Sequence, residues 1–219
     1  AVPKGYTPES YLEKLAGKGL EENYGGRGEY GRAKKIQEME LEIIEKLGYS
    51  SYFLIVREIR DWANSKFRSG YRKPKDCSIL RGSAANSITF FNIGVSDLDP
   101  IQHDLYFQRF LNEDRASPPD ADLDFSWDER DRVLDYIACR WGEDNVAITC
   151  TTNHFCRRAS FRETAKVFGY SEDQVTKIID SIKTETDRFQ DSEIFRILEL
   201  AEKIKGKPRF LGQHPGGVL

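Results

Sequence analysis

Hydrophobic residues in the first third of the chain recur at spacings of three and four positions, which is the period of one face of an α-helix. The clearest run extends from Ile36 to Leu47 and is followed by Gly48, a natural helix end. An earlier helix is expected to begin after Thr7, and a later one is expected to end near Lys66. The pattern therefore predicts three helices in this part of the chain.

A different pattern, with a period of two, occupies residues 120–125, where aspartates alternate with apolar residues. In a β-strand, Asp120, Asp122 and Asp124 would share one face, while the apolar residues between them would enter a core. Like charges on one strand face repel each other, so a bound hard cation with oxygen ligands is one explanation of the run. A solvated acidic turn is the other explanation, because Asp and Pro are common in turns.

A short strand is expected just before residues 81–87, which read Arg-Gly-Ser-Ala-Ala-Asn-Ser. A helix or buried strand follows, so Gly82 and Ser83 lie where backbone amides and a helix N-terminus can hold an anion. The loop lacks the Gly-Lys-Ser/Thr ending of a Walker loop, which argues against an ATPase. The plain alternative is an ordinary helix start, where small residues and a Ser cap are common.

The pattern changes again after the aspartate run. We expect a helix from Ser126 to about Trp141 and then a short strand at residues 146–150. From about Thr152 onward the hydrophobic spacing is entirely helical. The sequence therefore predicts a subdomain boundary near residue 151.

Cationic residues in this later part fall on one helix face. Arg158, Arg162 and Lys166 follow one another at spacings of four residues. Such a stripe often contacts the phosphate backbone of a nucleic acid without reading its sequence. It is also compatible with a merely solvated helix face.

Composition narrows the class of protein. Hydrophobic residues make up 39% of the 219 residues and charged residues 32%, as in a water-soluble globular protein. The sequence contains no apolar run near 18 residues, so we expect a cytoplasmic location and no membrane partner. The net charge of −3 argues against nucleic acid coating the whole surface but allows a local basic face. Because Ala1 is not a start methionine, we expect a piece of a longer protein.

Two arginines lie close to the aspartate run in the sequence. Arg109 and Arg115 carry forked donors that suit phosphate, although they could also simply balance the aspartates. An anion-holding loop, arginines and carboxylates together favour phosphoryl transfer, in which carboxylates hold two metal ions about 3.5–4 Å apart.

The order and spacing of these motifs resemble the palm of bacterial C-family DNA polymerases, the alpha subunit of DNA polymerase III. The resemblance covers nearly the whole chain. It rests on Arg-Gly-Ser-Ala-Ala-Asn-Ser (81–87), Asp-Leu-Asp-Pro (97–100), Phe-Gln-Arg-Phe-Leu-Asn (107–112), Pro-Asp-Ala-Asp-Leu-Asp-Phe (119–125) and His-Pro-Gly-Gly (214–217). The Ala-Ala-Asn-Ser variant resembles the error-prone branch, whereas His-Pro-Gly-Gly resembles the replicative form; we favour the error-prone branch.

The resemblance implies an α/β (α+β) palm of the polymerase-beta-like nucleotidyltransferase type with an inserted, all-helical thumb subdomain. The palm would comprise residues 1–151 and the thumb residues 152–209, and residues 210–219 would return to the palm. The implied activity is that of a DNA-directed DNA polymerase, which adds deoxynucleotides to a primer 3′-hydroxyl by two-metal phosphoryl transfer.

The resemblance also implies roles for single residues. Asp120 and Asp122 correspond to the two catalytic, metal-binding aspartates, which hold two Mg²⁺ ions in the complete site, and Asp124 is their neighbour on the strand. The implied nucleotide-binding residues are Gly82, Ser83, Arg109 and Arg115. The implied DNA-binding residues are Arg158, Arg162 and Lys166.

The implied partners are primer-template DNA and deoxynucleoside triphosphates, with a sliding clamp and replisome bound through regions outside this chain. The third catalytic aspartate of the family lies beyond the His-Pro-Gly-Gly motif, and the fingers are also outside the chain, so we expect these 219 residues alone to be inactive. Two alternatives remain open: a non-catalytic module that binds duplex DNA, and a metal-dependent nuclease.

Overall fold

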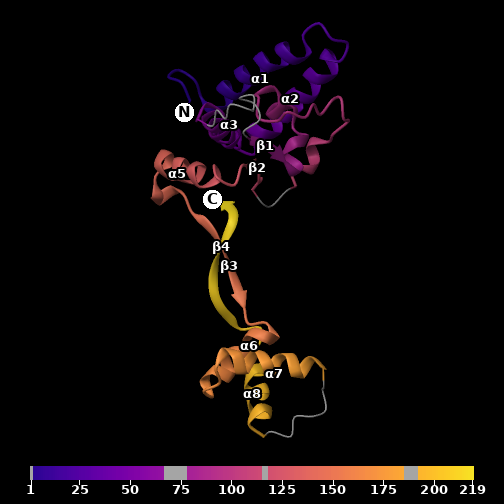
Figure 1. Ribbon diagram of the computed structural model, residues 1–219. Coiled ribbons are helices and arrows are strands. Elements are labelled where there is room, and N and C mark those ends of the chain that lie inside the picture. Colours follow the sequence, from indigo (N-terminus) through magenta and orange to yellow (C-terminus); the bar gives the residue numbers. More distant parts are fainter. Residues whose placement is uncertain (1, 67–77, 115–117, 185–191) are drawn as a thin grey trace. The chain divides into compact units, whose positions relative to one another are not determined.

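The computed structural model describes residues 2–66, 78–114, 118–184 and 192–219, which form two compact units (Figure 1). The first unit comprises Ala1–Trp141 and the second comprises Gly142–Leu219. The boundary between the units thus follows Trp141, whereas the sequence placed a subdomain boundary near residue 151. No helix of the described residues is both long enough and apolar enough to cross a membrane.

Three helices dominate the first unit, as the hydrophobic spacing predicted. They are α1 (Pro8–Tyr24), α2 (Tyr30–Lys46) and α3 (Ser50–Lys66), and α1 contacts both of the others. The hydroxyl of Thr7 accepts a hydrogen bond from the backbone N–H of Ser10 at 3.2 Å, which caps α1. Gly48 follows α2 at a φ of +74°, a left-handed conformation in which glycine allows the chain to turn toward α3.

A small antiparallel sheet lies in the same unit. Strand β1 (Ser78–Arg81) pairs with β2 (Asp122–Phe125), so that Leu80 lies opposite Leu123 and Arg81 lies opposite Asp122. The predicted strand at residues 120–125 is therefore confirmed from Asp122 onward, and Asp120 precedes it. Between the strands lie η2 (Gly82–Asn86), α4 (Ile88–Asn92) and η3 (Phe107–Arg109), and α5 (Arg130–Trp141) follows them.

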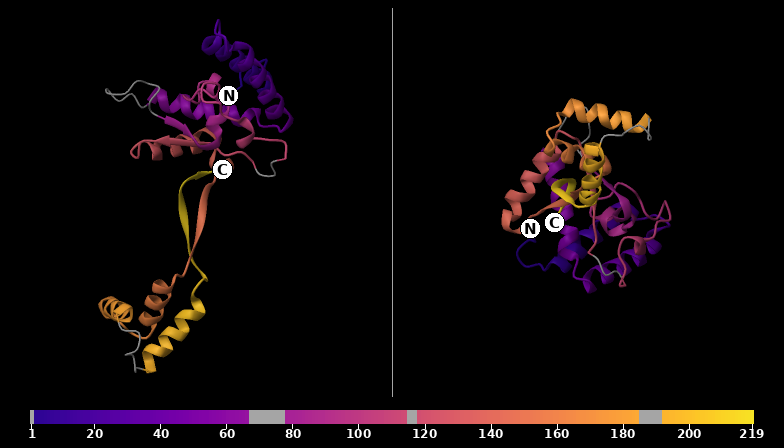
Figure 2. Two further views of the ribbon diagram at one scale, coloured as in Figure 1. Left: turned by 90° about the vertical axis from the view of Figure 1, so that its right-hand side faces the viewer. Right: turned by 90° about the horizontal axis from the view of Figure 1, so that it is seen from below.

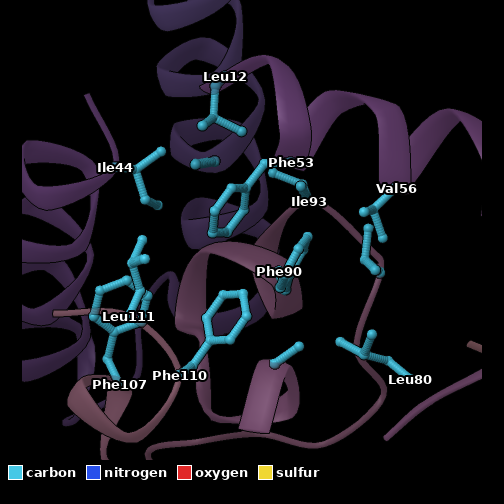
Figure 3. Packing of buried hydrophobic residues seen from close by; sticks show 13 residues of the cluster. Leu12, Ile44, Phe53, Val56, Leu80, Phe90, Ile93, Phe107, Phe110 and Leu111 are labelled. Atoms are coloured by element: carbon cyan, nitrogen blue, oxygen red, sulfur yellow. The ribbon is translucent and has the colours of Figure 1, made fainter. Parts of the chain in front are cut away.

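Aromatic residues fill the core of the first unit (Figure 3). Phe53 of α3 stacks on Phe90 of α4 with ring centroids 4.1 Å apart, and Phe110 packs edge-on against Phe53. Burial of such a side chain contributes about 1.5–3 kcal/mol. Leu123 and Ala121 pack against this core, so the apolar face of the aspartate strand is partly buried and faces the core as predicted.

Two partly buried sets of hydrogen bonds explain the Asp-Leu-Asp-Pro motif. The fully buried guanidinium of Arg60 donates hydrogen bonds to the Gly94 carbonyl and to Asp97 Oδ2, both at 2.6 Å. Asp99 accepts hydrogen bonds from the Tyr24 hydroxyl at 2.5 Å and from the Ile101 backbone N–H at 2.9 Å. Both aspartates therefore hold the chain that follows α4 in place.

The second unit combines a β-ribbon with three helices (Figure 2). Strand β3 (Ile148–His154) pairs antiparallel with β4 (Pro208–Val218), and a short turn, η4 (Glu143–Asn145), precedes them. The helices are α6 (Arg157–Val167), α7 (Glu172–Thr184) and α8 (Ser192–Ile204). Their shared core includes Phe161, Ala165, Val175 and Ile197.

One sequence prediction for the second unit is corrected. The helix expected from about Thr152 begins at Arg157, because β3 continues to His154. Its pairing partner begins at Pro208, more than fifty positions further along the chain, a non-local interaction that local spacing cannot show. The mixed α/β character of the fold is confirmed.

Candidate functional site

The outer face of the β1–β2 sheet carries the charged residues of the candidate site. Along β1, Ser78 and Leu80 are buried, whereas Ile79 and Arg81 are exposed. Along β2, Asp122 and Asp124 are exposed and lie opposite Arg81 and Ile79. Because alternate residues of paired strands share a face, these four side chains lie on one solvent-facing surface.

Arg81 binds one of the aspartates directly. Its Nε atom lies 2.5 Å from Asp124 Oδ2, and both side chains are about half exposed. The hydrogen bond to Asp124 and the charge of Asp124 raise the pKa of Arg81, and the charge of Asp122 adds to this effect. Arg81 was not among the residues predicted for the site, although its place at the end of a strand with alternating burial could have indicated it.

The predicted phosphate loop begins beside Asp122. Gly82 has a φ of +68°, and a Cβ added to it would lie 3.1 Å from Asp122 Oδ2. Glycine is therefore favoured here by the left-handed backbone conformation, and a side chain would also press closely on the carboxylate. Two motifs predicted separately from the sequence thus meet at one point of the structure.

The rest of the loop is held in place by buried alanines, and η3 packs against it. Ala84 and Ala85 are buried, whereas Ser83 is only partly covered. Element η3 contacts η2 and ends at Arg109, which is exposed, while Phe107 at its start is buried in the core. The structure therefore brings the element that carries Arg109 to the loop. Arg115 lies outside the described residues.

The helix N-terminus behind the loop is already occupied by a residue of the chain, which corrects one expectation. Both carboxylate oxygens of Glu40, from α2, accept hydrogen bonds at the start of α4. The donors are the Ser87 hydroxyl at 2.7 Å, the Ile88 backbone N–H at 2.9 Å and the Thr89 backbone N–H at 2.9 Å. An external anion cannot use these amides, so the loop and the arginines remain as its candidate ligands.

The pKa of Glu40 is also strongly perturbed. Its side chain is completely buried. Burial raises the pKa of Glu40 to about 7, although the hydrogen bonds donated by Thr89, Ser87 and Ile88 oppose that rise.

The donor set for a metal ion consists of two carboxylates. Asp120 and Asp122 are both exposed and lie two residues apart at the start of β2. Asp124 is engaged by Arg81, and within the described ranges no group of three or more His, Cys, Asp or Glu side chains is arranged to hold a metal ion. Two oxygen donors fit Mg²⁺, which usually keeps several waters and takes further ligands from substrate phosphates.

The predicted cationic stripe lies on α6 of the second unit. Arg158 and Lys166 are exposed and Arg162 is partly covered, while Phe161 on the opposite face is buried. Lys166 forms an ion pair with Glu172 at 2.8 Å. The hydrogen bond and charge of Lys166, together with the charge of Arg162, lower the pKa of Glu172. One cation of the stripe is therefore already balanced within the unit.

The His-Pro-Gly-Gly motif lies within β4 of the second unit. The ring atom Nδ1 of His214 accepts hydrogen bonds from the backbone N–H groups of Gly216 at 3.2 Å and Gly217 at 2.7 Å. A Cβ on Gly217 would lie 2.4 Å from the Thr149 hydroxyl, so this position of the ribbon accepts only glycine without a shift. The motif thus shapes the ribbon locally.

Comparison with known proteins identifies the family. The family described as bacterial DNA polymerase III alpha NTPase domain matches residues 10–219, and the chain belongs to this family. Similar curated proteins include the error-prone DNA polymerases of Pseudomonas paraeruginosa, at 34% identity, and Bdellovibrio bacteriovorus, at 35% identity. Both alignments cover the whole of this chain but only 22% and 21% of the relatives. The chain therefore spans about a fifth of their length, and the resemblance stated from the motifs is confirmed.

Proposed function

We propose that the chain forms part of the palm, together with the thumb, of an error-prone DNA polymerase that extends a primer 3′-hydroxyl with deoxynucleotides. The observation that carries this proposal is the contact between Gly82 and Asp122, which joins the loop motif to the aspartate motif. Membership of the DNA polymerase III alpha family also supports the proposal that the chain is part of a DNA polymerase. The first unit would supply most of the palm, of the polymerase-beta-like type, and the second would supply the thumb.

In this proposal the loop and its neighbours bind the incoming nucleotide. Backbone amides near Gly82 and Ser83 would contact the triphosphate, since successive backbone N–H groups in a tight loop form an anion-binding concavity. Arg109 would add positive charge from η3, and Arg115 is proposed for the same role from the sequence alone. These groups would orient the α-phosphate toward the primer hydroxyl, and such positioning supplies much of the rate.

The two aspartates at the start of β2 would hold the metal ions. Asp120 and Asp122 provide hard oxygen donors that fit Mg²⁺. Bound Mg²⁺ would supply the charge that activates the primer hydroxyl and stabilises the leaving pyrophosphate. Arg81 would keep Asp124 paired, so that the carboxylate next along the strand does not compete for the metal or repel the triphosphate.

The second unit would bind duplex DNA through α6. Arg158 and Arg162 would contact backbone phosphates, whereas Lys166 would contribute less because Glu172 already pairs with it. A sliding clamp and the replisome would bind through parts of the polymerase outside this chain. Without a third carboxylate and fingers, these residues alone should not extend a primer; extension abolished by Asp120→Asn would contradict that expectation.

Calorimetric titration with a deoxynucleoside triphosphate in Mg²⁺ tests the proposed site. We expect Asp122→Asn to weaken binding roughly tenfold, because a metal ligand is lost. Asp144→Asn, at an exposed position of the second unit, is the charge-matched control and should leave binding unchanged. Equal affinities for wild type and Asp122→Asn, or wild type without saturable binding, would contradict the proposal.

A second candidate function is a module that binds duplex DNA without chemistry, which the cationic face of α6 favours. It predicts salt-sensitive DNA binding that requires Arg158 and Arg162, together with no nucleotide binding by the first unit. The nucleotide titration therefore separates the two functions.

A further inference from the structure

Helix α4 has only five residues and depends on its neighbours for stability. At its start, Glu40 accepts the three hydrogen bonds from Ser87, Ile88 and Thr89. Ser87 also caps the helix, since its hydroxyl accepts a hydrogen bond from the Phe90 backbone N–H at 3.1 Å. A single buried carboxylate thus organises the whole first turn.

Other elements fix the far end of α4. A Cβ on Gly19 of α1 would lie 1.8 Å from the Asn92 carbonyl oxygen, so the two helix backbones are in direct contact. The Asn92 amide donates a hydrogen bond to Gln37 Oε1 at 2.6 Å, and Arg60 binds the Gly94 carbonyl just beyond the helix. Negative charge at the start of α4 and positive charge at its end also favour the helix dipole.

The predicted phosphate loop ends where this anchored helix begins. Ser87, the residue that Glu40 holds, directly follows η2, and its backbone N–H donates a hydrogen bond to the Ala84 carbonyl at 3.2 Å. At the other end of the loop, Gly82 continues from β1. The loop therefore spans two fixed points, the end of a paired strand and the residue bound by Glu40.

We infer that Glu40 is a positioning residue for the loop of Gly82–Asn86: by holding Ser87, Ile88 and Thr89 it sets the conformation that the loop presents beside Asp122. The inferred ligand of the loop, a triphosphate, rests on the function proposed above. The inference about the loop conformation rests on the hydrogen bonds alone.

The contact favours the carboxyl group of Glu40 over an amide. Three donors face the two oxygens, and an ionised carboxylate offers only acceptors. A glutamine would turn an amide N–H₂ toward at least one donor and leave buried polar groups unpaired. Tyr24 of α1 interacts electrostatically with Glu40 across the helix packing, and the pKa of Tyr24 is raised chiefly by burial and by its hydrogen bond to Asp99.

Hydrogen–deuterium exchange of the 219-residue chain tests the inference. In Glu40→Gln we expect the backbone amides of residues 83–89 to exchange roughly tenfold faster, while those of α1 keep their protection, because only the local opening free energy falls. Glu42→Gln, an exposed glutamate on the same helix, is the matched control and should exchange like wild type.

Two results would overturn the inference: unchanged exchange across residues 83–89, or an equal increase throughout the first unit, which would mark a purely structural role. If Glu40→Gln does not fold, Ser87→Ala removes one of the three donors and must show the same local pattern at smaller amplitude. Nucleotide titration of the same variants tests the proposed function independently of the exchange experiment. Absence of nucleotide binding in wild type overturns the proposed function, whereas the exchange pattern decides the role of Glu40.

Discussion

Gly82 and Asp122 lie so close together that a single added carbon on Gly82 would sit 3.1 Å from the Asp122 carboxylate. They are forty positions apart in the sequence, and the antiparallel pairing of β1 with β2 brings them together. This contact connects the loop predicted to bind an anion with the acidic strand, and it underlies the proposed nucleotide site.

Replacing Gly82 with Ala should affect both stability and binding. The left-handed φ of +68° costs an L-residue about 1–2 kcal/mol, and the new methyl group would press on Asp122. We therefore expect a lower free energy of unfolding in urea and weaker nucleotide binding. Gly31→Ala is the control, since Gly31 lies within α2 with open space around it; that change should stabilise the chain by about 0.5–1 kcal/mol. Equal effects of the two substitutions would contradict the role given to Gly82.

Replacing Arg81 with Ala should weaken nucleotide binding without unfolding the chain. The change removes the positive charge that pairs with Asp124, so three aspartates would then repel the triphosphate. We expect a loss of affinity of roughly threefold to tenfold that shrinks as salt is added, because these charges are exposed to solvent. The melting temperature should hardly move, since exposed ion pairs contribute little to stability.

Arg57→Ala provides the matched control for this prediction. Arg57 also forms an ion pair at the surface, with Asp61 on α3, although Arg57 is partly covered, and it lies on no predicted site element. Equal nucleotide affinities for Arg81→Ala and Arg57→Ala would show that Arg81 has no part in the site.

Glu40 should give the chain a distinctive dependence of stability on pH. Its pKa is raised from 4.5 to about 7 on folding, so the native state binds a proton that the unfolded state releases between these values. Its contribution to stability is therefore fully present below pH 4.5 and is lost as the pH rises through 7, by about 3 kcal/mol. Urea unfolding at pH 5, 6 and 7 should show this decline in wild type and a smaller decline in Glu40→Gln. Parallel profiles for the two proteins would refute the assignment.

The cations of α6 should contribute unequally to duplex binding. Arg158→Ala is expected to weaken binding several-fold and to reduce the slope of log affinity against log salt by about one. Lys166→Ala should have a smaller effect, because Lys166 is paired with Glu172. Fluorescence anisotropy with a labelled duplex measures both quantities. A larger loss of affinity in Lys166→Ala than in Arg158→Ala would contradict the unequal contributions expected of these two residues.

Local signals predicted much of this structure. Thr7 marked the start of α1 correctly, and the period of two around Leu123 correctly separated the partly buried, core-facing side of β2 from its exposed side. The same local reasoning predicted a strand only at residues 146–150 and missed both its extension to His154 and strand β4, because these depend on the pairing of β3 with β4. The Gly-rich end of the chain gave little sign of a strand.

Glu40 shows how a buried acid escapes notice in a helix that carries many exposed acids. Ala33, Gln37, Glu40 and Ile44 follow one another at intervals of four, three and four residues and are the buried positions of α2. That spacing places Glu40 in the core, but a search of the sequence for apolar residues at helical spacing does not find it. The exposed residues of the candidate site were proposed from motifs, whereas the contacts of Glu40 depend on packing between helices far apart in sequence.

The central claim is that the loop and the aspartate strand form one nucleotide site, and a double-mutant cycle between Gly82 and Asp122 tests it most directly. Calorimetric titration with a deoxynucleoside triphosphate and Mg²⁺ would be performed on wild type, Gly82→Ala, Asp122→Asn and the double variant. We predict that the two losses of binding free energy are not additive, with a coupling of about 1 kcal/mol or more, as for residues in contact. Additive losses would contradict the claim.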